Sequence, residues 1–244
     1  MFAPIVRRTP QSRTNPPGPG FTHLRYPVPS VMLIVTIDGP SGTGKSTVSK
    51  AAATAMSLPY LDTGAFYRAA TLAVIRSQVD PSDAASVLSV VSEATFDQRD
   101  GITYLDGEEV SEEIRTDRIT RAVSEVSAYP VVRQRLVELQ RSWVDQVGGS
   151  AVVEGRDIGS VVFPAAQVKV YLDARPEVRA ARRAAQAGED PTETSVDLLR
   201  RDQADSTRSA SPLIVPSGAH VIDTSDLTFE EVVDTVVRLV DSKS

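Results

Sequence analysis

The run Gly39-Pro40-Ser41-Gly42-Thr43-Gly44-Lys45-Ser46 is the part of this 244-residue chain whose residue types and spacing indicate chemistry most directly. It fits the pattern G-x-x-x-x-G-K-[ST], the P-loop. Glycines let backbone N–H groups turn inward around phosphate oxygens, and the positive end of a following helix adds to the attraction. Lys45 is placed to reach the outer phosphates, and the Ser46 hydroxyl is placed to bind Mg²⁺. The run therefore predicts a site for a nucleoside triphosphate.

The elements on either side of the loop support this prediction. Residues 31–37 form a continuous apolar run, typical of a strand buried on both faces, and residues 45–56 are expected to be helical. Beyond them, strands are predicted near 60–61, 151–153, 168–172 and 219–222, and helices at 64–76, 82–93, 117–128, 131–144, 176–187, 195–207 and 228–240. This alternation predicts an α/β fold: a central parallel sheet covered by helices on both faces.

Residues 94–110 break that alternation. Asp100-Gly101 and Asp106-Gly107 are hairpin-turn dipeptides, and they flank a β-prone segment at residues 102–105. We expect a small antiparallel meander inserted into the parallel fold.

Composition excludes several classes of function. The chain has no cysteine and only two histidines, which argues against disulfides, thiolate metal sites and a Ser-His-Asp hydrolase. Its 32 acidic residues exceed its 26 basic ones, so we expect no nucleic-acid partner. No apolar run approaches the roughly 20 residues that span a bilayer, so we expect no membrane partner and a cytoplasmic protein.

Residues 1–30 differ from the rest of the chain. They hold seven of the 16 prolines and four arginines, with no acidic residue. We expect a disordered leader, or an upstream start read in place of Met32, rather than a packed element. These arginines contribute +4 to the formal net charge of −6, which leaves −10 for the remaining residues.

The class of nucleotide-binding protein follows from what accompanies the loop. Asn15 is the only asparagine, so the Asn-Lys-x-Asp motif of GTPases is absent. A small kinase needs a second anion site for its acceptor, and arginine suits it because its planar fork grips phosphate in two places.

Three stretches could supply that second site. Residues 62–68, ending in Arg68, and residues 154–157, containing Arg156, each follow a predicted strand. Arg201, Asp205 and Arg208 share one face of a predicted helix. Each stretch has a simpler interpretation: a surface arginine for Arg68, a structural ion pair for Arg156, and a solvated salt-bridge face for the helix.

Taken in order, residues 39–47, 61–68, 110–116, 154–159 and 161–164 resemble the bacterial cytidylate kinase family. The resemblance runs from about Leu33 to the C-terminus. It implies a P-loop kinase that transfers the γ-phosphoryl group of ATP to CMP or dCMP, with Mg²⁺. It also implies a core over 31–244, a nucleotide-binding insert at about 94–140 and a lid at about 186–194.

The resemblance also implies roles for individual residues. Lys45, Arg156 and Arg208 would be catalytic, and Ser46 would contact the metal ion. ATP would be bound by Gly39, Pro40, Ser41, Gly42, Thr43, Gly44, Lys45, Ser46 and Thr47. The acceptor phosphate would be surrounded by Thr63, Arg68, Arg156 and Arg208, the cytosine recognised by Ser124, Arg133 and Asp157, and the ribose held by Arg201 and Asp205. Glu154, which stands where members of the family carry an acid, would also be a substrate-binding residue.

This sequence departs from the family pattern at one position of the lid-side helix. Many relatives carry a further arginine within the run 201–208, where Ala204 stands here. Phosphate clamping could then shift to Arg201, Arg208 and the pair Arg182-Arg183. Two other functions remain open: another P-loop kinase, of the adenylate or shikimate type, and an ATP-binding sensor without turnover. We expect a monomer.

Overall fold

The computed structural model describes residues 32–188, 190–208 and 211–242. The expected leader at 1–30 lies outside the described residues. Five strands build the main sheet: β1 (Ile34–Asp38), β2 (Tyr60–Asp62), β6 (Ala151–Glu154), β7 (Val168–Asp173) and β8 (His220–Asp223). Their order is β2-β6-β1-β7-β8, and every neighbouring pair is parallel. The predicted parallel sheet is confirmed.

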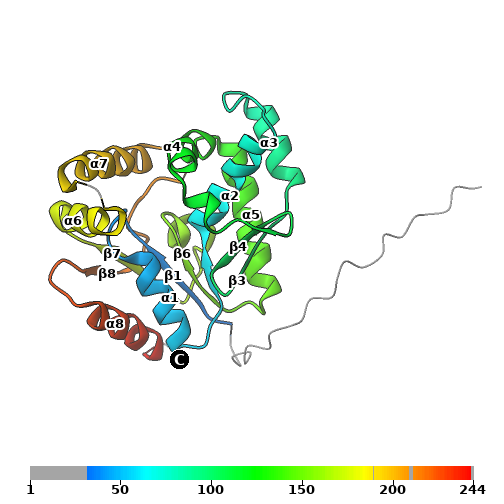
Figure 1. Cartoon of the computed structure of the whole chain (residues 1–244). Coiled ribbons are helices and arrows are strands. Elements are labelled where there is room, and N and C mark those ends of the chain that lie inside the picture. The colour runs from blue at the N-terminus through cyan, green and yellow to red at the C-terminus, as the bar shows by residue number, and fades with distance from the viewer. Residues whose placement is uncertain (1–31, 189, 209–210, 243–244) are drawn as a thin grey trace, which may run out of the picture.

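Helices cover the two faces of this sheet (Figure 1). Successive residues of β6 point to opposite faces: Val152 packs in one core cluster with α1 (Lys45–Ala55) and α8 (Phe229–Asp241). Val153 packs in another with residues of α5 (Pro130–Gln146). Burial of both faces explains why these strands are continuous apolar runs.

The predicted meander forms a second sheet of β3 (Phe96–Arg99), β4 (Ile102–Leu105) and β5 (Glu108–Glu109), paired antiparallel. Both turn dipeptides adopt positive φ, with Asp100 at 53° and Gly101 at 80° in the first turn. This conformation matches the twist of hairpin strands, which confirms the hairpin prediction.

The remaining elements connect the strands of the two sheets along the chain. They are α2 (Thr63–Arg76), α3 (Ala84–Glu93), η1 (Glu113–Arg115), α4 (Asp117–Val126), η2 (Ile158–Val162), α6 (Pro176–Ala187) and α7 (Pro191–Thr207). In Figure 1, α7 and α4 lie at the same end of the molecule.

Several predicted boundaries were wrong. The helix expected from Ser82 begins at Ala84, because the side chain of Asp83 accepts from the N–H of Ala85 and caps it. The helix expected from Ser195 begins at Pro191, a residue favoured in a first helical turn. Helix therefore occupies part of the predicted lid segment 186–194. The short helical segment η2 was not predicted.

Candidate active site

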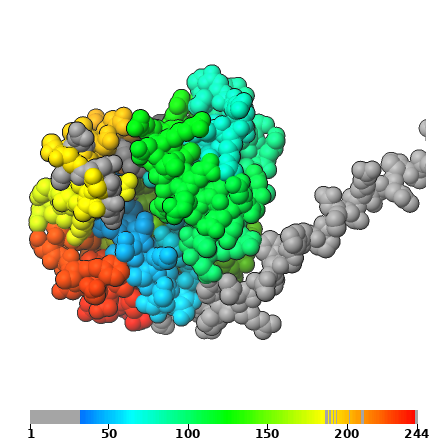
Figure 2. All heavy atoms as spheres, in the orientation of Figure 1, coloured from blue at the N-terminus to red at the C-terminus, as the bar shows by residue number. Residues whose placement is uncertain are grey.

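A cleft of about 530 Å³ opens at the carboxyl end of the main sheet. It is lined from the P-loop, from the start of α2, from α4 and α5, from the segment after β6, and from α6 and α7. In the space-filling view, blue atoms of the N-terminal third lie between the yellow atoms of α6 and the green atoms of α4 (Figure 2). The cleft thus joins segments that are far apart in the sequence.

The P-loop connects β1 to α1, as predicted. A Cβ atom at Gly39 would lie 2.0 Å from the carbonyl oxygen of Leu172, and one at Gly42 would lie 2.8 Å from that of Arg179. Both residues also have positive φ, so glycine is required at these two positions by backbone conformation and by close packing. The Lys45 ammonium donates to the carbonyl of Pro40 at 2.7 Å, so the lysine folds back over its own loop.

Lys45, which is partly buried, and Glu154, which is buried, both line the cleft. Burial lowers the pKa of Lys45, and the neighbouring Arg156 lowers it further, whereas Glu154 and Asp38 act in the opposite direction. Burial raises the pKa of Glu154, as does the negative charge of Asp62. Moving an ammonium group out of water costs free energy unless an anion neutralises its charge, and the phosphates of a nucleoside triphosphate would supply that anion.

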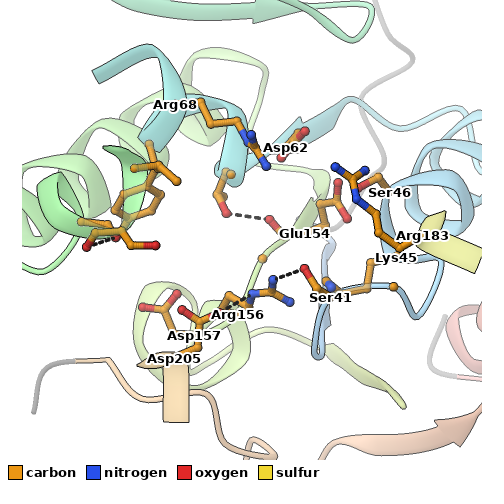
Figure 3. Close-up of a pocket in the computed structure, with 18 of the residues that line it drawn as sticks. Ser41, Lys45, Ser46, Asp62, Arg68, Glu154, Arg156, Asp157, Arg183 and Asp205 are labelled. Carbon is orange, nitrogen blue, oxygen red and sulfur yellow. Dashed lines mark hydrogen bonds and ion pairs between the residues drawn. The ribbon is translucent and has the colours of Figure 1, made fainter. Parts of the chain in front are cut away.

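Arg156 binds the P-loop directly. Its Nη2 donates to the Ser41 hydroxyl at 2.8 Å, and its Nη1 donates to the carbonyl of Gly39. Its Nε lies 3.0 Å from a carboxylate oxygen of Asp205, on the predicted ribose-binding helix (Figure 3). Arg156 therefore connects the donor loop to α7 through an ion pair with Asp205, whereas the pair considered from sequence was with the acids that flank Arg156.

Ser41 is contacted from the other side by α6 and α7. Its carbonyl accepts from Arg179 at 3.2 Å, and its N–H lies 3.4 Å from a carboxylate oxygen of Asp202. Arg179 and Asp202 are themselves ion-paired. Neither was predicted as a site residue, and together they fix the backbone of the P-loop.

Arg133 and Asp157 form a buried ion pair at the far end of the cleft. Arg133 Nη2 lies 2.9 Å from Asp157 Oδ2, and each side chain is only 4% exposed. The guanidinium carbon also lies 4.9 Å from the centre of the Tyr67 ring, a cation–π geometry. Tyr67 was not predicted, although its position one residue before Arg68 in the motif places it on the same helix.

The other predicted acceptor residues surround the space between these groups. Thr63 donates its hydroxyl to the carbonyl of Glu154 at 2.7 Å, and Arg68 Nη1 donates to the Thr120 hydroxyl at 3.0 Å. Arg208 follows α7, with its Nη2 3.3 Å from Asp205. Ser124, on α4, lines the cleft.

The two arginines considered as replacements at the Ala204 position differ in orientation. Arg182 Nη2 donates to the carbonyl of Thr224 at 2.7 Å and its Nη1 to the Thr224 hydroxyl at 2.9 Å. Figure 3 shows Arg183 near Lys45 and Ser46. Both line the cleft, and Arg182 is held there by Thr224, the residue that follows β8.

The cleft brings together most of the predicted site. It is lined by Ser41, Gly42, Gly44, Lys45, Ser46, Thr47, Thr63, Arg68, Ser124, Arg133, Glu154, Arg156, Asp157, Asp205 and Arg208. Gly39, Pro40 and Thr43 belong to the loop but are not among the lining residues, and the Thr43 hydroxyl donates to the carbonyl of Pro40 at 3.1 Å. The side chain of Arg201 lies outside the described residues. Asp62, which lines the cleft, was missed as a site residue although it opens the 62–68 stretch.

The residues present fit ATP and Mg²⁺. Oε2 of Glu154 is buried and has no hydrogen-bond partner among the described residues. Ser46 lies on the same side of the cleft (Figure 3), and a hydroxyl with a carboxylate oxygen is the oxygen donor set that Mg²⁺ prefers. The described ranges contain no group of three or more His, Cys, Asp or Glu residues that could hold a metal without help from phosphate. They also contain no helix that could cross a membrane.

Comparisons with known proteins point to one family. A family model described as cytidylate kinase matches residues 35–242. A cytidylate kinase of Mycobacterium leprae (strain Br4923) is 48% identical over 217 residues, covering 87% of this chain and 97% of the relative. One of Streptomyces avermitilis is 47% identical over 221 residues, covering 88% of this chain and 95% of the relative.

Among solved structures, an uncharacterized protein from Eubacterium ventriosum ATCC 27560 has a TM-score of 0.51 at 12% identity, with 86% of this chain and 99% of that chain covered. That likeness concerns the fold alone. The sequence matches extend over nearly the whole described region and nearly the whole of each relative. The chain therefore belongs to the cytidylate kinase family.

Proposed function

We propose that the cleft transfers the γ-phosphoryl group of ATP to CMP or dCMP, giving CDP or dCDP and ADP. The observation that carries this function is the position of Arg156. Its guanidinium contacts the P-loop through Ser41 and also the acceptor wall through Asp205. Donor and acceptor phosphates bound on its two sides would meet within the same cleft.

On the donor side, the P-loop amides and Lys45 bind the ATP phosphates. Thr47, at the start of α1, belongs to the same binding site. Mg²⁺, when bound, neutralises phosphate charge, and Ser46 with Glu154 would hold it. Closure of the carboxyl end of the sheet around these groups lowers the local dielectric, which strengthens their electrostatic effect on the charge that develops in transfer.

On the acceptor side, Thr63, Arg68, Arg156 and Arg208 bind the phosphate of CMP. Ser124, Arg133 and Asp157 recognise the cytosine, and Arg201 with Asp205 holds the ribose. The Arg133–Asp157 pair supports this because two fixed, opposite charges can present a donor and an acceptor together. Cytosine carries an amine donor beside a carbonyl acceptor.

The transfer needs no general base. A phosphate monoester has its second pKa near 6, so the attacking oxygen of CMP is mostly anionic at neutral pH. The protein places the two phosphates in line and cancels their repulsion, and Lys45, Arg156 and Arg208 supply the positive charge.

Water must be excluded during transfer, because ATP hydrolysis would compete with it. We assign this task to closure of the insert at about 94–140 and the lid at about 186–194 over the core at 31–244. We further propose a cytoplasmic monomer whose partners are small nucleotides, with neither nucleic acid nor a membrane as a partner.

Two substitutions test these assignments. Lys45→Ala and Arg156→Ala should each lower kcat for CMP by about 100-fold or more, the effect of losing one preorganised cationic or hydrogen-bonding group. The melting temperature should change little by comparison. Turnover near that of the unmodified protein in either variant would contradict the catalytic assignment. The variant Arg135→Ala, at a partly exposed arginine that does not line the cleft, is the matched control.

A further inference from the structure

Tyr60 is a partly buried residue whose hydroxyl the proposed mechanism does not use. It is the first residue of β2 and is not among the residues that line the cleft. Its hydroxyl nevertheless lies 2.6 Å from Oε1 of Glu154, to which it donates a hydrogen bond. The contact joins residues 94 positions apart in the sequence, across the parallel pair β2 and β6.

This bond leaves one carboxylate oxygen of Glu154 available. Within the described part of the chain, Oε2 is buried without a hydrogen-bond partner. The neighbouring acid, Asp62, is already engaged: one oxygen accepts from the N–H of Ala65 at 3.1 Å, and the other lies 3.7 Å from Arg115. Glu154 is thus the acid of this pair with an oxygen to spare for a ligand.

The Tyr60 hydroxyl is the donor in this bond, because the oxygen of an ionised carboxylate can only accept. Burial raises the pKa of Tyr60, and the negative charges of Glu154 and Asp62 raise it further. A group that stays a donor fixes which oxygen of its partner is used. A phenylalanine of the same shape would leave the carboxylate free to rotate about its last bond.

We propose that Tyr60 is a positioning residue for the transfer: its hydroxyl holds Oε1 of Glu154 so that Oε2 faces the Mg²⁺ site beside Ser46. This inference rests on the proposed function. Tyr60 itself touches neither nucleotide nor ion and acts only through Glu154.

The test is the gain in ATP affinity that Mg²⁺ produces, measured as the ratio of ATP dissociation constants without and with Mg²⁺ by calorimetry on the full chain. Tyr60→Phe should reduce this ratio by about tenfold, the effect of losing a hydrogen bond to a charged group. The dissociation constant without Mg²⁺ and the KM for CMP should stay unchanged.

Tyr129→Phe is the matched control. The Tyr129 hydroxyl also makes a partly buried hydrogen bond, to the carbonyl of Pro81 at 2.8 Å, outside the cleft. This variant should keep the full Mg²⁺ gain. In a protein that already carries Glu154→Gln, adding Tyr60→Phe should not lower the Mg²⁺ gain further, because the carboxylate through which Tyr60 acts is already absent.

An equal Mg²⁺ gain in Tyr60→Phe and Tyr129→Phe would overturn the proposal, as would an undiminished effect of Tyr60→Phe in the Glu154→Gln background. If Tyr60→Phe does not fold, Tyr60→Leu carries the test, since it also removes the hydroxyl that donates to Glu154 and should show the same loss. Failure of the proposed function would appear differently: the unmodified protein would bind ATP without phosphorylating CMP.

Discussion

Arg156 and Ser41 join the two halves of the site: the arginine Nη2 donates to the serine hydroxyl at 2.8 Å. A P-loop side chain thereby orients a guanidinium that we assign to the acceptor. Ser41 is also held at its backbone by Arg179 and Asp202, so its hydroxyl is a fixed acceptor. The donor loop and the acceptor site are therefore mechanically coupled.

This coupling predicts that Ser41→Ala, although it lies in the ATP loop, mainly harms the acceptor. The KM for CMP should rise about tenfold, the effect of losing one hydrogen bond to a charged group, while the KM for ATP changes much less. Initial-rate kinetics with each substrate varied in turn will separate the two. Ser86→Ala, whose hydroxyl bonds to Asp83 on the surface, is the control. A selective loss of ATP binding would contradict the coupling.

We predict different roles for the two neighbouring arginines: Arg182 stabilises the fold, whereas Arg183 contributes to the rate of transfer. Arg183→Ala should lower kcat by about 100-fold with little change in melting temperature, because its charge lies near Lys45 in the cleft. Arg182→Ala should lower the melting temperature, because it removes two hydrogen bonds to Thr224.

Ala204→Arg tests whether Arg183 replaces the arginine that many relatives carry. Added to Arg183→Ala, it should restore part of kcat. The interpretation fails if Arg182→Ala and Arg183→Ala have the same kinetic and thermal profiles.

The Arg133–Asp157 pair should contribute to the stability of the fold as well as to the recognition of CMP. Asp157→Ala leaves a buried guanidinium without its counter-charge, and the free energy of unfolding should fall by about 3 kcal/mol or more. The double variant Arg133→Ala/Asp157→Ala should lose less than the two single variants combined, because it removes both charges. Denaturant unfolding of the four proteins measures this. Strict additivity would show that the pair is not coupled.

Asp38 predicts a pH dependence of stability. Burial raises the pKa of Asp38 from 3.8 to about 6, against the effect of hydrogen bonds from the N–H groups of Gly159 and Ile158. Between about pH 4 and 6 the folded protein keeps this proton while the unfolded chain has lost it. The contribution to stability is therefore present below pH 4 and is lost as the pH rises through 6.

Comparison with Asp38→Asn isolates this group. The difference in the free energy of unfolding between the two proteins should move in favour of the variant, by on the order of 3 kcal/mol, from pH 4 to pH 7. Denaturant titrations at four pH values are sufficient. If the free energies of unfolding of the two proteins change in parallel with pH, the pKa of Asp38 is not raised in the folded protein.

The features that could be predicted from sequence are those set by local patterns. The apolar run before Gly39 specifies a buried strand within a few residues, and the dipeptide Asp100-Gly101 likewise specifies a hairpin turn. Both the strand and the hairpin formed there. Contacts such as Tyr60 with Glu154, or Arg179 with Asp202, could not be predicted, because they join distant residues whose meeting depends on the packing of strands and helices. The start of α7 at Pro191 was missed because residues 191–194 carry no clear apolar period.

The central claim is tested most directly by phosphoryl transfer from Mg·ATP to a panel of CMP, dCMP, UMP, AMP, GMP and shikimate, followed by ADP release. We predict strong selectivity for CMP and dCMP, and loss of that selectivity in Asp157→Asn. Preferred turnover of AMP or shikimate would contradict the acceptor assignment while leaving the ATP loop intact. Tight ATP binding without turnover of any acceptor would contradict the account as a whole.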